Sequence, residues 1–149
     1  MEELQLHLIP LKHTHINNKN EKKEIFIMIM TNNEIYTRAR QLMEAFQDGE
    51  QKLPIKINFY LQKNKAALLA LAQDIEKTRL EIAQSYGVLD ESGEQFVIPN
   101  DKLAEASREL EDLFNLEQDV TIYKINVDAL TDDLTMTMAQ MEAIMFMID

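Results

Sequence analysis

The stretch PIKINFYLQKNKAALLALAQDIEKTRLEIAQSY, residues 54–86, decides the fold, because its pattern predicts one uninterrupted helix. Proline is favoured in the first turn of a helix and glycine just past its end, and the boundary positions hold Pro54 and Gly87. At about 1.5 Å per residue this helix would span roughly 50 Å. A compact domain of this size is narrower than that, so the sequence predicts an elongated molecule or a bent helix.

Apolar side chains recur every seven residues along this helix and predict a seam for partner helices. The repeat consists of Leu61, Leu68, Ile75 and Ile82, with Ile57, Leu71 and Tyr86 beside it. Asn64 and Thr78 interrupt the seam. Polar residues at such positions either fix the register of a coiled coil or lie at the flank of an ordinary bundle stripe. We favour the flank.

Two shorter helices are predicted to pack along the long one. Thr31 and Glu34 have the spacing of a capping box, which starts a helix through about Asp48. Asn100 is expected to cap a second helix that runs to about Leu116. The short link at residues 50–53 makes the first helix an antiparallel neighbour of the N-terminal half of the long one. The second should cover the other half.

A small sheet and a terminal helix complete the predicted fold. Residues 88–89 and 96–98 flank a polar turn and predict a β-hairpin, and residues 120–125 predict a strand that joins its edge. A second capping box, Thr137 with Gln140, starts a Met-rich C-terminal helix. The predicted class is α+β and mainly α, with a long central helix, two shorter helices packed on it and a small antiparallel sheet at one end.

The first twenty-nine residues differ in kind from the rest, so we expect residues 30–149 to form a single elongated helical domain. Residues 1–29 have little helical pattern and are rich in Asn, Lys and Ile. Two interpretations stay open. They are a disordered leader, or they reflect a mis-assigned translation start, because codons for Lys22–Ile25 can contain a bacterial ribosome-binding sequence upstream of Met28 or Met30.

Composition argues against several classes of function. The chain has no cysteine, which excludes disulfides and thiolate chemistry, and its three glycines do not form a phosphate-binding loop. His13 and His15, with His7 further away, lack a carboxylate pair that would complete a metal site. No apolar run approaches a membrane span and no signal peptide is evident. We therefore expect a cytoplasmic protein that has no cofactor, no resident metal and no enzymatic activity.

The charge is concentrated in the last third of the chain. The net charge is -11, and residues 101–149 hold twelve acidic and three basic side chains. Such a surface repels phosphate backbones, so we expect no direct binding of nucleic acid. The same charge is compatible with a basic protein partner. The candidate partner-binding residues are Glu105, Glu109, Asp112, Glu117, Asp119, Asp132 and Asp133. The alternative is a solvated face that keeps the protein soluble.

Methionines mark a second candidate surface. Five of the nine methionines lie in the last fourteen residues, and Met141 and Met145 fall on the predicted terminal helix. Methionine is flexible and adapts to varied partners, so a Met-rich stripe is typical of promiscuous docking faces. The commoner case is a terminal helix that closes an imperfect core, which is the interpretation we favour.

The order of features over residues 31–149 resembles small uncharacterised accessory proteins of tailed bacteriophages and their prophages. The resemblance rests on short structural motifs and carries no catalytic residues; the motifs are Leu53–Leu61, Tyr86-Gly87, the acidic turn, Leu110–Leu113 and Val120–Ile122. It implies an origin in a mobile element and an accessory role in a bacterial host cell.

Together these features predict non-catalytic binding to a protein partner. The sharper form is an acidic inhibitor that occupies the basic nucleic-acid groove of a host-defence protein. The alternative is a structural phage component, of the virion or its assembly, that self-associates through the helical seam. Homo-oligomerisation stays open in both.

Overall fold

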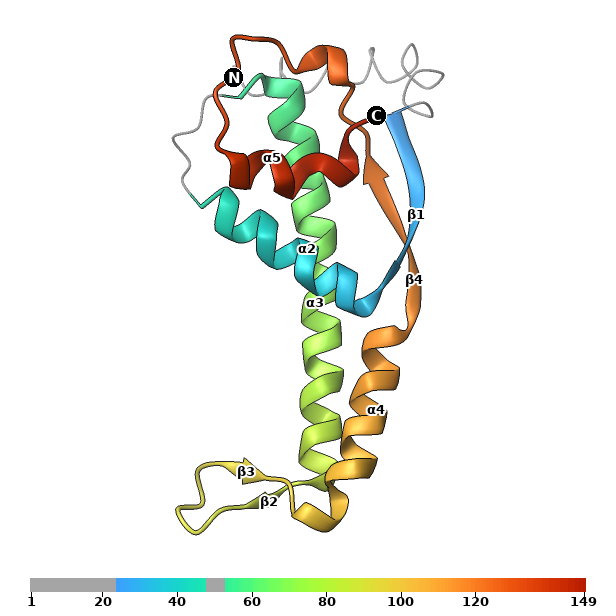
Figure 1. The fold of residues 1–149 in the computed structure, drawn as a ribbon, viewed down its shortest axis with the longest axis vertical. Coiled ribbons are helices and arrows are strands. Elements are labelled where there is room, and N and C mark those ends of the chain that lie inside the picture. Colours follow the sequence, from blue (N-terminus) through green and yellow to red (C-terminus); the bar gives the residue numbers. More distant parts are fainter. Residues whose placement is uncertain (1–23, 48–52) are drawn as a thin grey trace, which may run out of the picture.

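A computed structural model describes residues 24–47 and 53–149, and its architecture is α+β and mainly α (Figure 1). The elements in chain order are β1 (Ile25–Thr31), α2 (Asn32–Ala45), α3 (Ile55–Tyr86), β2 (Val88–Leu89), β3 (Phe96–Val97), the 3₁₀ turn η1 (Asn100–Lys102), α4 (Leu103–Asn115), β4 (Glu117–Tyr123), η2 (Val127–Ala129), α5 (Met138–Ile144) and η3 (Met145–Met147).

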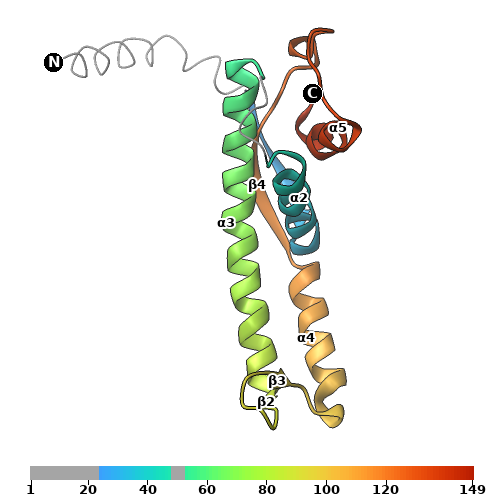
Figure 2. The same cartoon turned by 90° about the vertical axis from the view of Figure 1, so that its left-hand side faces the viewer.

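The long helix α3 forms as predicted and runs the full length of the molecule (Figures 1 and 2). It begins directly after Pro54 and ends before Gly87, whose N–H donates to the Ala83 carbonyl oxygen at 2.8 Å. A Cβ at residue 87 would lie 2.8 Å from that oxygen and 3.2 Å from the Cβ of Phe96. The close approach of hairpin and helix therefore requires glycine here.

The seam of α3 is buried within the protomer as far as Ile75, and Ile82 is half-buried. Its buried residues are Ile57, Tyr60, Leu61, Asn64, Leu68 and Ile75, and it contacts α2, β4 and α4. Thr78 is exposed, as predicted, but the flank position predicted for Asn64 is wrong because its side chain is 0% exposed. Asn64 is accommodated in the core because its amide is hydrogen-bonded to the backbone of β4.

The principal sheet differs from the prediction. β4 was expected at the edge of the hairpin, but it pairs with β1 in an antiparallel register that runs from Ile25↔Tyr123 to Thr31↔Glu117. The hairpin β2–β3 is a separate two-stranded sheet at the far end of α3 (Figure 1). The domain boundary predicted at residue 30 falls inside β1. The sequence does not reveal this strand, because residues 25–30 are all apolar. Buried and exposed side chains alternate along it only in the folded sheet, where one face is covered.

The two flanking helices pack on α3 as predicted, with corrections at their ends. The Thr31 hydroxyl accepts from the Glu34 N–H at 3.1 Å, but α2 ends at Ala45 rather than near Asp48. Residues 48–52, which include most of the predicted link, lie outside the described part. α4 lies along the distal half of α3 (Figure 1), but it begins at Leu103. Asn100 does not cap it, because Asn100 opens the 3₁₀ turn that follows Pro99.

The terminal helix α5 completes a layered upper half. The capping box of Thr137 and Gln140 is present, and Gln140 Nε2 also donates to the Ala45 carbonyl oxygen at 3.0 Å. α3, α2 and α5 follow one another as layers in Figure 2, with the β1–β4 sheet behind them. Ile144 and Met147 are buried in the shared core. The favoured interpretation, that this segment closes the core, is confirmed for Ile144, but Met138 and Met145 are exposed, so the methionine stripe as a whole does not face the core.

Candidate functional site

Three of the predicted acidic residues line one exposed face of α4. Glu105, Glu109 and Asp112 are spaced by four and three residues, so they share a helix face. Ala106 and Leu113 lie about a quarter turn round the helix from these carboxylates and are buried against α3. The Glu109 carboxylate accepts a hydrogen bond from the Tyr86 hydroxyl at 2.9 Å, and this bond raises the pKa of Tyr86.

Two more predicted residues lie on β4, the strand that follows α4. Leu116 is the single residue between α4 and β4, and Glu117 and Asp119 then project from the exposed face of the strand. Val120 and Ile122 alternate with them and are buried. Glu105, Glu109, Asp112, Glu117 and Asp119 therefore follow one another from α4 into β4, and we call them the acidic stripe.

An apolar row borders the acidic stripe on the sheet. Antiparallel neighbours that face each other project from the same side of a sheet, and the register places Ile29 opposite Asp119 and Ile27 opposite Thr121. Ile27 is 68% and Ile29 63% exposed, and Ile25 at the start of β1 is also exposed. We call these three side chains the isoleucine row. Sequence reasoning missed the row, because residues 25–30 are all apolar and show no contrast between their two faces.

The other predicted residues lie elsewhere. Asp132 and Asp133 are exposed in the segment between η2 and α5, which crosses the top of the molecule in Figure 1, whereas α4 lies in the lower half. Met141 is half-buried and Met145 exposed, on a segment that packs against α2. The structure thus divides the predicted set among three places. Only the α4 and β4 residues lie on elements that follow each other directly in the chain.

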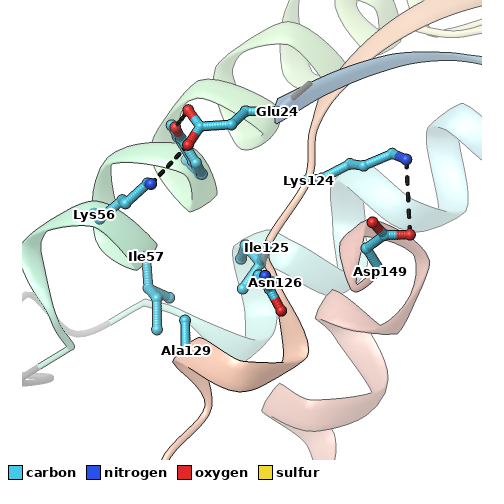
Figure 3. Close-up of a pocket in the computed structure, with 9 residues that line it drawn as sticks. Glu24, Lys56, Ile57, Lys124, Ile125, Asn126, Ala129 and Asp149 are labelled. Atoms are coloured by element: carbon cyan, nitrogen blue, oxygen red, sulfur yellow. Dashed lines mark hydrogen bonds and ion pairs between the residues drawn. The ribbon is translucent and has the colours of Figure 1, made fainter. Parts of the chain in front are cut away.

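A cavity of about 240 Å³, with both charged and apolar side chains in its lining, lies beside the start of β1 (Figure 3). Glu24 accepts hydrogen bonds from Lys56 Nζ at 2.6 Å and from the Tyr60 hydroxyl, and the bond from Lys56 is the main cause that lowers the pKa of Glu24. Lys124 Nζ lies 3.7 Å from Asp149 Oδ1. Both lysines are thus already paired with carboxylates. The cavity therefore offers little excess charge for recognising a charged ligand.

The described residues contain neither a cluster of metal ligands nor a helix suited to span a membrane. Within residues 24–47 and 53–149, no three His, Cys, Asp or Glu side chains converge to hold a metal ion. His7, His13 and His15 lie outside this part of the chain. In the same residues no helix combines the length and apolar character needed to cross a bilayer.

No protein-family profile matches the chain, and no significant match was found among curated proteins or solved structures.

Proposed function

We propose that this chain is a non-catalytic protein-binding protein whose contact surface combines the acidic stripe with the isoleucine row. The observation that supports this is the register of the β1–β4 sheet, which sets the carboxylate of Asp119 beside the exposed side chain of Ile29. Apolar side chains bordered by charges are typical of surfaces that bind proteins.

The chemistry of this surface selects a class of partner. A row of carboxylates attracts a basic surface and repels phosphate backbones, and the adjacent isoleucines require an apolar strip on the same partner. We propose a basic host protein in the bacterial cytoplasm, with the protein acting as a phage- or prophage-type accessory factor. In its sharper form it is an acidic inhibitor that fills the basic nucleic-acid groove of a defence protein.

Self-association through the helical seam receives less support. Leu61, Leu68 and Ile75, which would have to face a second copy, are each at most 3% exposed and pack inside the protomer. Exposing them would require α2, β4 and α4 to separate from α3. The structural alternative would therefore need a different contact surface.

The proposal is tested by capture of a partner and by its salt dependence. The immobilised protein should retain one main species from a bacterial lysate. That species is then purified and its affinity measured at rising salt. Binding should weaken strongly toward about 0.5 M salt, because the Debye length falls from about 10 Å at 0.1 M to a few ångströms.

Charge reversal locates the contact. Glu109→Lys with Asp112→Lys should slow association and leave the melting temperature nearly unchanged, because both side chains are exposed. The matched control reverses Asp132 and Asp133, which lie away from the stripe. Equal loss in the control would refute the stripe as the contact. Binding that survives reversal but fails in Met141→Ala with Met145→Ala would move the contact to α5.

A further inference from the structure

Strand β1 has a backbone edge that no described strand covers. In an antiparallel ladder, facing residues alternate between pairs that exchange hydrogen bonds and pairs that do not. Lys124 N donates to the Glu24 carbonyl oxygen at 2.6 Å and Asn32 N donates to that of Leu116 at 2.8 Å, so the even-numbered residues of β1 bond to β4. By this alternation the N–H and C=O groups of Ile27 and its odd-numbered neighbours point to the opposite edge. Within residues 24–47 and 53–149, β1 pairs with β4 and with no other strand.

The two backbone edges of the β1–β4 sheet differ in what covers them. On the β4 side, the Asn64 amide makes both backbone hydrogen bonds of Tyr123, so a side chain from α3 occupies the place of a neighbouring strand. On the β1 side the upper part of the strand forms the right-hand margin of the molecule in Figure 1. The open edge of this sheet is therefore that of β1.

The sequence of β1 does not protect this edge. Sheet edges are ordinarily guarded by charged residues, proline or bulges, which prevent pairing with another chain. Residues 25–31 contain no charged residue, no proline and no glycine, and the strand pairs with β4 over all seven residues without a bulge. The edge is suited to an occupant that is itself extended, uncharged and rich in β-branched side chains.

We propose that this occupant is a second copy of the chain, and that two β1 strands pair antiparallel across a two-fold axis to form a four-stranded sheet. β1 has the properties that the edge requires, and a two-fold contact brings the same surface of both copies together. Charge restricts where two copies can meet, because residues 101–149 carry a net charge of -9 and repel their counterpart, whereas β1 is uncharged. In this arrangement the acidic β4 strands lie three strand spacings apart, about 14 Å, which exceeds the Debye length of about 8 Å at physiological salt.

The side chains select the register of this contact. With the two-fold axis at Ile27, Ile25 faces Ile29 of the partner subunit and the two Ile27 side chains face each other. A shift that places the axis at Met28 would set Thr31 against Ile25 of the partner subunit and lose an isoleucine contact. The first register brings all six isoleucines together, and cross-strand pairs of this kind stabilise sheets. The interface goes beyond the proposed binding function and does not depend on it.

The first test measures the mass of the full-length protein by light scattering during size exclusion. We expect a dimer at tens of micromolar. Ile27→Lys should yield a monomer, because it places a charge at the centre of the uncharged edge. Ile55→Lys is the matched control, because Ile55 is 89% exposed at the start of α3 and the chemical change is the same. This control should remain a dimer, and circular dichroism should show both variants folded.

A second test uses the absence of cysteine from the chain. Ile27→Cys introduces a single thiol, and two facing residues of a hydrogen-bonded antiparallel pair have Cα atoms about 5.5 Å apart, within the range that a disulfide spans. Mild oxidation should cross-link this variant and leave Ile55→Cys mainly uncross-linked. A monomeric wild type overturns the proposal, and this includes the case in which residues 1–23 cover the edge of their own chain. Dimerisation that persists in Ile27→Lys, or equal cross-linking of the two cysteine variants, overturns it as well.

Discussion

Replacing Asn64 should destabilise the protein through the backbone of β4. Asn64 is fully buried, its Nδ2 donates to the Tyr123 carbonyl oxygen at 2.9 Å, and its Oδ1 accepts from the Tyr123 N–H at 2.7 Å. Asn64→Leu keeps a side chain of similar size but leaves both backbone groups without this partner. The two unpaired groups together cost about 2–6 kcal/mol, and burial of leucine recovers about 1.5–3 kcal/mol. From the middle of each range we expect a net loss of about 2 kcal/mol in the free energy of unfolding.

The assay is urea unfolding followed by far-ultraviolet circular dichroism, with Thr78→Leu as the control. Thr78 is the other polar residue of the seam, but it is exposed and its hydroxyl bonds only within α3, to the Asp74 carbonyl oxygen at 3.2 Å. We expect the control to change stability by no more than about 0.5 kcal/mol. The amide of Tyr123 should exchange hydrogen faster in Asn64→Leu. If the two variants unfold at the same urea concentration, the Asn64 amide does not hold the strand and the reasoning is refuted.

Four further changes test other parts of the fold. Deletion of residues 2–29 should abolish the cooperative thermal transition, because it removes most of β1 and leaves Met30 without a strand; a cooperative melt in the shortened protein would contradict this. Leu68→Ala should cost about 2–5 kcal/mol in a denaturant titration, because Leu68 is 0% exposed. Ile82→Ala should cost less, because Ile82 is only half-buried. The hydrogen bond from Lys56 lowers the pKa of Glu24 below its ordinary value of 4.5, so the unfolded state binds more protons than the folded state in this range. The resulting stability is complete above the unfolded pKa and is lost as pH falls through the lower folded pKa. Glu24→Gln should therefore flatten the fall of melting temperature below about pH 4.5, and an unchanged profile would show that the pair does not contribute.

Local signals in the sequence identified the helices well. Pro54 and Gly87 bracket α3 as expected, and the capping box at Thr137 is formed. These signals act over a few residues, so they can be read without knowing the fold. The acidic face of α4 was predictable for the same reason, because positions three and four apart share a helix face.

Long-range pairing could not be read in the same way. β1 contains six apolar residues in succession, and only its partner strand determines which of them face the core. Asn64 appeared to be a flank residue because the group that satisfies it, the backbone of Tyr123, lies 59 positions away in the chain. The isoleucine row follows from the pairing of β1 with β4, so the sequence predicted the charged part of the proposed contact surface and missed its apolar part.

The position of β1 in the chain has a consequence for synthesis on the ribosome. Its last residue, Thr31, pairs with Glu117, which is 86 positions later. At about 5–20 residues per second, synthesis of the intervening segment takes roughly 4–17 s. Throughout that interval an uncharged, β-branched segment has emerged without its native strand, and neighbouring nascent chains carry the same segment. We expect chaperones that bind nascent chains to bind β1 first, and to release it once β4 has emerged.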